Sequence, residues 1–353
     1  MLAASAVRAG FRCIAIDLFA DTDTRSIADC VQLSSFQESL MLPPLSDLCA
    51  KFGRLPLVYG SGIDTRPKLL EKIARYVRPL GNSPAVLDRL QAPKKFFAVL
   101  DRLQIPYPEV RFSRPCDPRS WLYKIPYTEG GFGVLPAVRY RGGGCGYFQK
   151  KIESRPFSVS FIANQREARI LGFNTQSTAA SDGGFPYRFS GIINRAFLSR
   201  EQKAVLSRHV DTLVGSLGLT GFHSLDFLIE DSRCLVLEVN PRPCASLMLY
   251  DRDFDSGLLN AHIRAVEAFE LPEAVGGSRR VRGLEIVYAP RALVLNQALR
   301  WPSWVVDRPA PGTRLSAGDA LLTVTAAASS RKAVVSLLAL RRHAILESLA
   351  LLG

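Results

Sequence analysis

Residues Leu225 to Arg242 read Leu-Asp-Phe-Leu-Ile-Glu-Asp-Ser-Arg-Cys-Leu-Val-Leu-Glu-Val-Asn-Pro-Arg. Two apolar runs flank a short polar turn, a pattern that predicts a β-hairpin. Side chains alternate between the faces of a strand, so Glu238 and Asn240 share a face, and Asp226 on the partner strand can approach them. Two carboxylates and an amide oxygen are hard ligands that suit Mg²⁺, or Mn²⁺, held also by substrate phosphates. Arg242 follows and can neutralise a phosphoryl group.

The alternative for this hairpin is a set of polar residues on a solvated face. Glu238 and Asn240 interrupt an otherwise apolar strand, and Pro241 and Pro243 then end it. Charged and amide side chains within a strand that reads as buried need a reason to be there. The pattern therefore favours a metal site.

The composition is that of a globular protein with two or three subdomains: 353 residues, 47% hydrophobic and 22% charged. No apolar run approaches the roughly 18 residues that span a bilayer, and no signal peptide is visible, so we expect no membrane association. Seven dispersed cysteines without a Cys-x-x-Cys pair favour reduced thiols and a cytoplasmic location. The net charge of +13 is spread along the chain without a basic block, so we expect no nucleic-acid partner.

The first 90 residues alternate helical and strand patterns, which predicts a Rossmann-like α/β domain with a parallel sheet. Helices are expected near 2–10, 24–30, 67–76 and 83–90, and strands near 12–18 and 56–59. A Rossmann-like unit normally begins with a strand and a glycine-rich turn, whereas this sequence starts within a helix. Either the first strand is missing from this sequence or the domain opens with a helix.

The remainder divides into a central domain over 91–271 and a small β-rich part with a terminal helix over 272–353. An amphipathic helix is expected at 92–103, a long helix at 200–217, and a final helix at 332–351. Strands are expected near 121–125, 147–152, 157–163, 168–175, 285–288 and 321–325.

A glycine-rich loop follows the strand that carries Lys124. It contains Gly130, Gly131 and Gly133. Glycine allows backbone N–H groups to approach phosphate oxygens closely, and a lysine on the preceding strand supplies a positive charge. Such loops are often plain turns, but the position ahead of the hairpin favours a phosphate-binding loop. A second glycine run, 142–144, is expected to be a turn between strands.

The hairpin resembles the metal-binding end of ATP-grasp enzymes, whose signature is Glu-x-Asn-Pro-Arg-Pro with an Asp on the preceding strand. The wider sequence is similar to a group of predicted ATP-dependent carboligases with a biotin-carboxylase-like ATP-grasp domain, linked to methanopterin-dependent one-carbon metabolism. The matching residues are Asp17–Thr24, Tyr147–Gln149, Arg155–Ser158, Leu171–Phe173, Ser224–Phe227 and Glu238–Pro243.

The resemblance implies an ATP-grasp fold with an N-terminal Rossmann-like domain and a small β-rich C-terminal part. It implies that the lysine-bearing helix with Lys95 opens the nucleotide-binding part, although Gln104 stands where glycine is usual. It also implies that a hinge holds adenine by main-chain hydrogen bonds, here Gln149, Lys150, Lys151, Ile152 and Glu153. The family usually has acidic residues where this chain has Lys150 and Pro156, which puts side-chain contacts to ribose in doubt.

The implied activity is a ligase that uses ATP and Mg²⁺ to convert a carboxylate into an acyl phosphate. An amine, or a thiol, then attacks the acyl phosphate. In this reaction Lys124 would contact phosphates and Arg242 would stabilise the transferring phosphoryl group. The expected partners are small-molecule carboxylate and amine substrates, and a homodimer is compatible with the resemblance. A non-catalytic ATP-binding regulatory protein and a biotin-carboxylase-like enzyme remain as alternatives.

Three further polar residues invite weaker expectations. Arg188 and Arg195 could hold a substrate carboxylate in a bidentate manner, or lie on the surface as structural residues. His223 is close to Asp226 in sequence, and we expect it to have a core or supporting role, because acyl-phosphate chemistry does not require a histidine.

Overall fold

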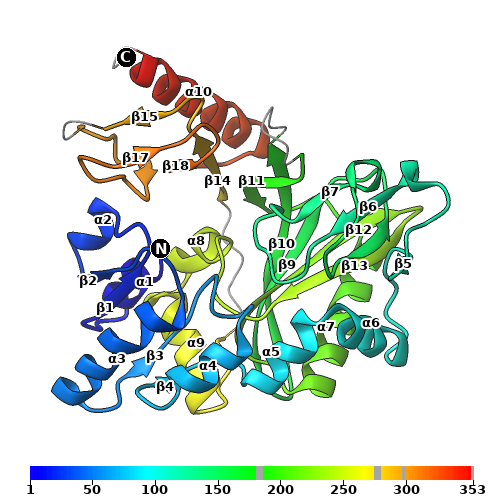
Figure 1. Ribbon diagram of the computed structural model, residues 1–353, viewed down its shortest axis with the longest axis horizontal. Helices are drawn as coiled ribbons and strands as arrows, with labels where there is room; N and C mark the ends of the chain where they lie inside the picture. The colour runs from blue at the N-terminus through cyan, green and yellow to red at the C-terminus, as the bar shows by residue number, and fades with distance from the viewer. Residues whose placement is uncertain (180–185, 274–279, 296–298, 351–353) are drawn as a thin grey trace.

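The computed structural model describes residues 1–179, 186–273, 280–295 and 299–350. Its centre is an eight-stranded sheet of order β13-β12-β9-β10-β11-β14-β18-β16, in which neighbouring strands are antiparallel (Figure 1). A four-stranded antiparallel sheet of order β5-β8-β6-β7 lies at one side of it. The protein is therefore a mixed α/β structure, as predicted.

The strands of the large sheet are β9 (Phe157–Asn164), β10 (Ala168–Ala179), β11 (Arg188–Asn194), β12 (Thr220–Glu230), β13 (Arg233–Asn240), β14 (Val281–Tyr288), β16 (Val305–Val306) and β18 (Ala320–Ala328). The small sheet contains β5 (Val110–Arg111), β6 (Trp121–Lys124), β7 (Val134–Pro136) and β8 (Tyr147–Lys150), and a separate pair is formed by β15 (Leu293–Val294) and β17 (Arg314–Leu315). The helices of these regions are α6 (Pro93–Arg102), α7 (Arg200–Leu217), α8 (Leu247–Tyr250), α9 (Gly257–Glu267) and α10 (Arg331–Ala350), with short 3₁₀ turns at Pro118–Ser120, Ala137–Arg139 and Asp251–Asp253.

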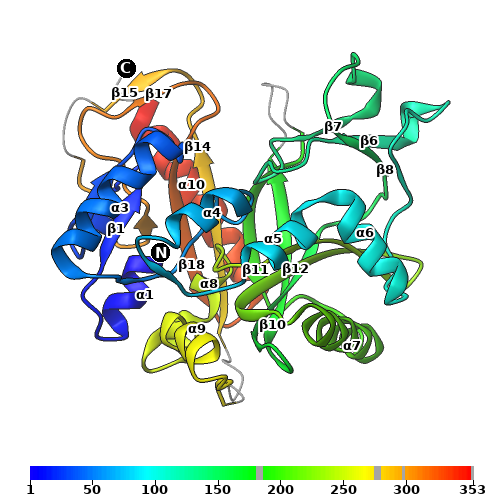
Figure 2. The same ribbon diagram turned by 60° about the horizontal axis from the view of Figure 1, so that its bottom comes forward.

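Successive side chains of a strand point to opposite faces of the large sheet, and each face packs against a different helix. Phe161 and Phe227 pack in one cluster with Leu213 of α7. Ile162, next to Phe161 in β9, packs in a second cluster with Leu258 of α9. Figure 2 shows α7 and α9 in separate places below the strands. Because the middle of the sheet is covered on both faces, its polar residues need partners within the protein.

The terminal helix covers the other end of the large sheet. Val334, Leu338 and Ile345 of α10 pack against Val287 of β14 and Val324 of β18. Strand β14 also pairs with β11, so the sheet runs without a break from the central region into the C-terminal residues. The expected final helix is confirmed.

The N-terminal elements are α1 (Leu2–Arg8), β1 (Ile14–Asp17), α2 (Thr22–Arg25), β2 (Asp29–Gln32), α3 (Glu38–Phe52), β3 (Pro56–Leu57), α4 (Pro67–Ile73), β4 (Arg78–Pro79) and α5 (Pro84–Gln91). Their strands are parallel, as predicted, but they form two separate pairs, β1–β2 and β3–β4.

One sequence expectation for this region was wrong, and one helix was not predicted. A helix was expected at 24–30, but the chain turns after α2 and forms β2. In β2, Val31 pairs with Ile16 of β1, and both contact the local core. Helix α3 was not predicted, because Pro43 and Pro44 lie inside it and interior proline normally breaks a helix.

The N-terminal region is attached to the C-terminal region by backbone contacts. The carboxylate of Asp23 accepts hydrogen bonds from the backbone N–H groups of Asp307 and Arg308, at 3.0 and 2.8 Å. The N–H of Thr22 donates to the Arg308 carbonyl at 2.8 Å. Figure 1 shows α2 below the C-terminal strands, in agreement with these contacts.

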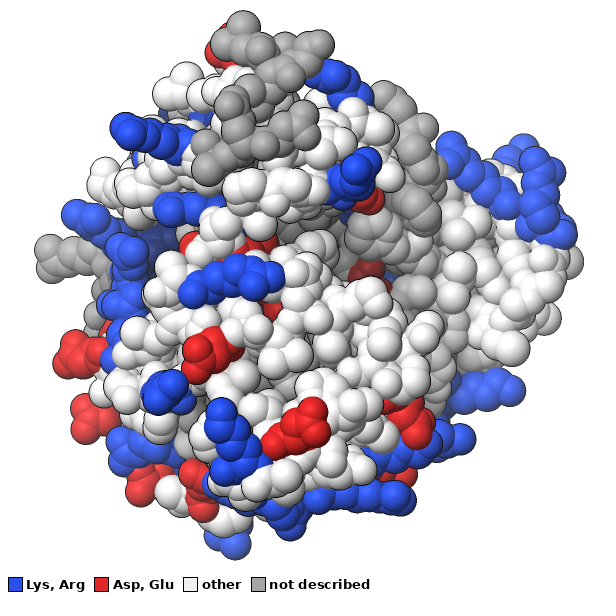
Figure 3. Space-filling view, turned by 60° about the vertical axis from the view of Figure 1, so that its left-hand side comes forward, with Lys and Arg blue, Asp and Glu red and all other residues white. Residues whose placement is uncertain are grey.

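On the face drawn in Figure 3, lysine and arginine side chains lie among acidic and neutral ones in the middle and gather in small groups at the upper right and the left edge. None of the helices in the described parts of the chain is long and apolar enough to cross a membrane. All seven cysteines have free thiols.

Candidate functional site

The hairpin β12–β13 brings the predicted ligand residues together. Asp226 pairs with Glu238 across the two strands, and Ser224 pairs with Asn240. The register shifts directly after Asp226, and a bulge of this kind re-aims the neighbouring side chains. Asn240 Nδ2 lies 3.4 Å from Asp226 Oδ2. The juxtaposition expected from strand alternation is therefore present.

Asp226 is half-buried and surrounded by hydrogen-bond donors. Gln176 Nε2 and Ser224 Oγ donate to Asp226 Oδ1 at 3.1 and 3.0 Å. Burial raises the pKa of Asp226, and the negative charge of Glu238 raises it further. A divalent cation between the two carboxylates would remove this repulsion, so the donor set fits Mg²⁺. Within the described residues no three His, Cys, Asp or Glu side chains gather into a metal cluster, so this site would depend on the amide and on the substrate for its other ligands.

Lys124 reaches this edge from the small sheet. It ends β6, and burial lowers the pKa of its ammonium group, while the charges of Glu238 and Asp226 raise it. The structure thus brings a lysine from one sheet into the electrostatic field of two carboxylates from the other. Tyr147 of β8 lies in the same field, because burial and Glu238 both raise the pKa of its hydroxyl.

Arg242 is held by a residue that the sequence analysis did not identify. Its Nε lies 3.0 Å from Oδ2 of Asp64, with the side chains 9% and 1% exposed. Its Nη2 approaches Asn240 Oδ1 at 3.5 Å. Asp64 lies in the turn after β3, where the only sequence signal was the short Gly-Ser-Gly turn at 60–62. The pair fixes the arginine beside the predicted metal ligands.

Asn82 is a second residue that the sequence analysis missed. Its Nδ2 donates to the carbonyls of Pro241 and Thr220 at 3.1 and 3.2 Å, and its Oδ1 accepts from the Thr220 N–H at 3.0 Å. Asn82 Nδ2 also lies 3.0 Å from Nε2 of His223. Asn82 therefore fixes the backbone immediately after Asn240.

His223 has the supporting role that was expected. It is fully buried and its ring stacks on Phe161 with a centroid separation of 4.9 Å. Burial lowers its pKa to about 3. A neutral imidazole in this position serves packing and hydrogen bonding.

The glycine-rich loop, residues 125–133, lies against β11. The Phe189 N–H donates to the Gly130 carbonyl at 2.9 Å. A Cβ on Gly131 would lie 2.0 Å from the Tyr187 carbonyl oxygen, and Gly131 has φ +78°, so only glycine fits there. A Cβ on Gly133 would also collide, with the side chain of Thr128. In contrast, Gly142 and Gly143 have open space around them and form the expected turn between strands.

The predicted hinge begins with the last two residues of β8, Gln149 and Lys150, because this strand ends at Lys150 and not at the expected residue 152. The N–H of Lys150 donates to the Glu109 carbonyl and that of Lys151 donates to the Ser120 carbonyl. Lys151 Nζ pairs with Glu153 Oε1 at 2.5 Å. The backbone N–H groups of the first hinge residues are thus used within the protein.

Further side chains at the hinge have contrasting surroundings. The backbone carbonyl of Ile152 accepts a hydrogen bond from the Ser154 N–H at 2.9 Å. Lys150 Nζ donates to Ser120 Oγ at 3.0 Å. Gln149 is 1% exposed, and its Nε2 has no hydrogen-bond partner within the described residues. A buried donor without an acceptor is costly and is a natural contact for a ligand atom.

The remaining candidates lie on other elements than the hairpin. Lys95 is exposed on α6 and forms an ion pair with Asp88 of α5. Arg188 is buried, with its guanidinium 3.5 Å from the centroid of the Tyr288 ring. Arg195 is exposed after β11.

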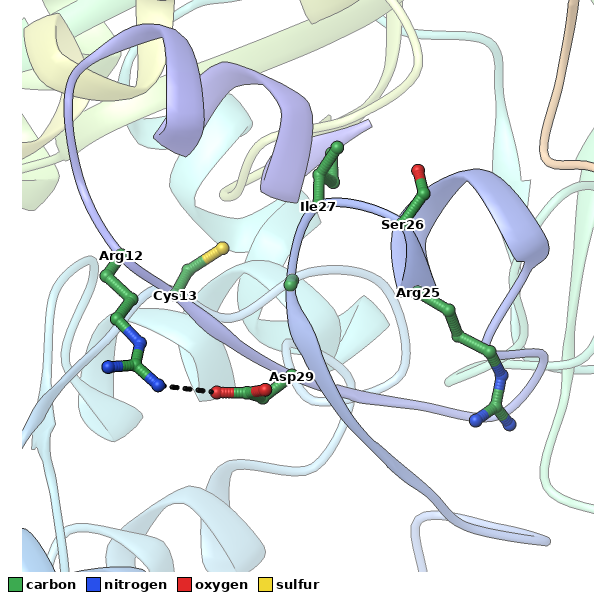
Figure 4. A pocket seen from close by; sticks show the side chains of 7 residues that line it. Arg12, Cys13, Arg25, Ser26, Ile27 and Asp29 are labelled. Atoms are coloured by element: carbon green, nitrogen blue, oxygen red, sulfur yellow. Dashed lines mark hydrogen bonds and ion pairs between the residues drawn. The ribbon is translucent and has the colours of Figure 1, made fainter.

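A separate cavity of about 260 Å³ lies in the N-terminal region (Figure 4). It is lined by Arg12, Cys13, Arg25, Ser26, Ile27, Ala28 and Asp29. None of these residues belongs to the hairpin edge, the glycine-rich loop or the hinge.

Comparison with known proteins identifies the central region. Residues 94–246 match the family described as the ATP-grasp domain. This region is therefore similar to ATP-grasp domains. No curated protein sequence matches this chain significantly.

Solved structures share the fold of nearly the whole chain. L-amino acid ligase from Bacillus licheniformis has 15% sequence identity and a TM-score of 0.73, over 96% of this chain and 93% of that one. N5-carboxyaminoimidazole ribonucleotide synthetase from Thermus thermophilus has 14% identity and a TM-score of 0.70, over 96% and 93%. Biotin carboxylase from Campylobacter jejuni has 14% identity and a TM-score of 0.72, over 95% and 86%. The expected ATP-grasp fold is confirmed.

Proposed function

We propose that this protein is an ATP- and Mg²⁺-dependent ligase that activates a carboxylate as an acyl phosphate and joins it to an amine or a thiol. The observation that carries the proposal is the pairing of Asp226 with Glu238 in an ATP-grasp domain. Lys124 acts in the field of both carboxylates, and Arg242 is fixed beside Asn240. These groups combine metal ligands with two cations at one place, as phosphoryl transfer requires.

In the proposed reaction, a substrate carboxylate oxygen attacks the γ-phosphorus of ATP, and the bond to the bridging oxygen breaks to release ADP. The amine nitrogen then attacks the acyl carbon, loses a proton, and forms a C–N bond as phosphate leaves. Asp226, Glu238 and Asn240 would hold Mg²⁺, which neutralises phosphate charge when bound. Lys124 binds phosphate oxygens, and Arg242 stabilises the charge that develops on the transferred group.

For the nucleotide, we propose that the glycine-rich loop covers the phosphates and that the hinge binds adenine. The unpartnered Nε2 of Gln149 supports a contact with the nucleotide. Because the N–H groups of Lys150 and Lys151 are already used, main-chain recognition falls to Ile152 and Glu153. Lys95 would join this set only by leaving its ion pair with Asp88. The resemblance to the carboligase group supports substrates from one-carbon cofactor metabolism.

The first test is the thermal stability of the protein with ATP, ADP and GTP, each with and without Mg²⁺. We expect a magnesium-dependent rise with the adenine nucleotides, since a ligand at 100 times its Kd stabilises by about 2.7 kcal/mol. Glu238→Gln should abolish the magnesium dependence. Glu230→Gln is the matched control, because Glu230 is an exposed residue of the same hairpin. A wild-type protein that responds to no nucleotide would refute the proposal, and a positive result justifies screening acids and amines for ADP release.

A further inference from the structure

The turn between β3 and α4 contacts two parts of the candidate site at once. Ser61 Oγ donates to Oε2 of Glu129 in the glycine-rich loop, and Thr65 Oγ1 approaches Oε1 of the same residue at 3.5 Å. Asp64, between these two hydroxyl residues, forms the ion pair with Arg242. A single short turn of the N-terminal region therefore reaches both the loop and the end of the hairpin.

We infer that this turn latches the glycine-rich loop in its closed position and couples loop closure to the orientation of Arg242. Ser61 and Thr65 hold the loop through Glu129, while Asp64 holds the arginine. All three are positioning residues. The inference rests on the proposed function in one respect only, namely that the loop covers a nucleotide.

The loop is held by two elements, β11 and the turn between β3 and α4. On one side its backbone packs on β11, where the Gly130 carbonyl accepts from Phe189. On the other side its contacts are the hydroxyls that meet Glu129. At β11 the loop also meets a side chain, since the Arg188 guanidinium lies 6.0 Å from the centroid of the Phe132 ring. At the turn the contacts are hydroxyls that meet the Glu129 carboxylate, so substitutions in the turn change these contacts and leave those at β11 in place.

The Asp64–Arg242 pair gives the turn a rigid anchor. Oδ2 of Asp64 forms the ion pair with Arg242, and the backbone of Gly62 also stabilises the carboxylate. Breaking one side of a buried ion pair leaves an uncompensated charge, so movement at one end of the turn is costly. Burial opposes the charge on Arg242, while Asp64 and, more weakly, Glu129 raise its pKa. Glu129 is thus close enough for its charge to act on the arginine when the loop is closed.

Limited digestion of the ligand-free full-length protein by chymotrypsin tests the latch. Tyr127 and Phe132 in the loop are 49% and 44% exposed, so cleavage after them reports on loop opening and can be identified by mass. Ser61→Ala combined with Thr65→Val should accelerate this cleavage about tenfold, since hydrogen bonds to a charged group are removed. Glu129→Gln should accelerate it to a smaller extent.

The control for these variants is Ser207→Ala combined with Ser348→Ala, which removes two exposed helix hydroxyls. It should be cleaved at the wild-type rate. Cleavage at buried aromatic residues such as Phe161 and Phe222 reports global unfolding and should stay unchanged in every variant. Loop cleavage of the Ser61/Thr65 variant at the wild-type rate would overturn the latch.

The coupling is tested by Asp64→Asn, which removes the charged partner of Arg242. It also removes the repulsion between Asp64 and Glu129, but that direct effect would slow loop cleavage, opposite to the effect of lost coupling. If the turn couples the Asp64–Arg242 ion pair to the contacts with Glu129, loop cleavage should accelerate several-fold in Asp64→Asn. Asp64→Glu should restore part of the protection. Asp88→Asn is the matched control, because Asp88 forms an exposed ion pair with Lys95. Unchanged loop cleavage in Asp64→Asn would overturn the coupling. Since these digestions need no nucleotide, a failure of the latch is distinguishable from a failure of nucleotide binding.

Discussion

Lowering the pH from 7.5 to 5.5 should remove stability that depends on two buried histidines. His262 Nδ1 accepts a hydrogen bond from the Phe222 N–H at 2.8 Å, so its proton lies on Nε2, which donates to the Leu80 carbonyl at 3.0 Å. Protonation of Nδ1 would destroy the first of these bonds inside the core. Burial lowers the pKa of His262 to about 4, and that of His223 to about 3, from an ordinary value of 6.5.

The sign and size follow from proton linkage. Between the folded and unfolded pKa values the unfolded chain binds more protons, so stability falls as the pH falls. For a pKa of 6.5 in the unfolded chain and about 4 in the folded one, the change from pH 7.5 to 5.5 costs about 1.3 kcal/mol for each histidine. Burial raises the pKa of Asp21 and of Asp226 to about 7, and these groups act in the opposite direction. The informative quantity is therefore a difference between variants.

The assay is reversible urea denaturation followed by tryptophan fluorescence at both pH values. His262→Gln keeps an acceptor for Phe222 and a donor for Leu80 but does not titrate. The wild type should lose about 1.3 kcal/mol more of its unfolding free energy than this variant between pH 7.5 and 5.5. His343→Gln, on the exposed surface of α10, is the control and should behave like the wild type. An identical pH dependence in the wild type and His262→Gln would refute the reasoning.

Three substitutions in the candidate site extend these predictions. Glu238→Gln should lower magnesium-dependent ATP turnover at least ~100-fold with an unchanged circular dichroism spectrum, because charge neutralisation at the phosphates is lost; near-normal turnover would argue against the metal site. Lys124→Ala should weaken nucleotide binding about 10-fold to 100-fold, as measured by calorimetry, since a charged contact to phosphate is removed; an unchanged affinity would contradict its assignment. Gly131→Ala should displace the glycine-rich loop and lower the melting temperature, because its Cβ would meet the Tyr187 carbonyl. Gly142→Ala, at a similarly positive φ but in open space, should cost only the backbone strain of about 1–2 kcal/mol, so equal effects at the two glycines would exclude the collision as the cause.

The local elements were predictable where one physical rule decided them. Helix α7 begins and ends as expected, because Ser199 and Gln202 form a capping box and Gly218 ends it in the left-handed conformation. Helix α3 was missed because its two prolines contradict the local rule. Its interior prolines are tolerated in a helix whose Met41 and Leu45 are buried in the N-terminal core.

In the candidate site, too, local rules predicted some features and tertiary packing decided the others. Asp226 and Glu238 could be paired from the sequence, because they lie on consecutive strands joined by a tight turn, and alternation then decides which side chains meet. Their ATP-grasp context could also be read from the motif that follows. Local periodicity was sufficient for the first inference, whereas the second rests on the resemblance of the motif to a known family.

The environment of these residues was decided only by the tertiary structure. Asp64 reaches Arg242, Asn82 reaches the Pro241 carbonyl, and Lys124 acts on the carboxylates, each from a region distant in the sequence. Such contacts depend on how separately formed sheets and turns pack against each other, and no periodicity along the chain encodes that packing. The sequence alone therefore determined which groups could carry the chemistry, whereas the packing of the N-terminal region and the small sheet onto the hairpin decided what holds those groups in place.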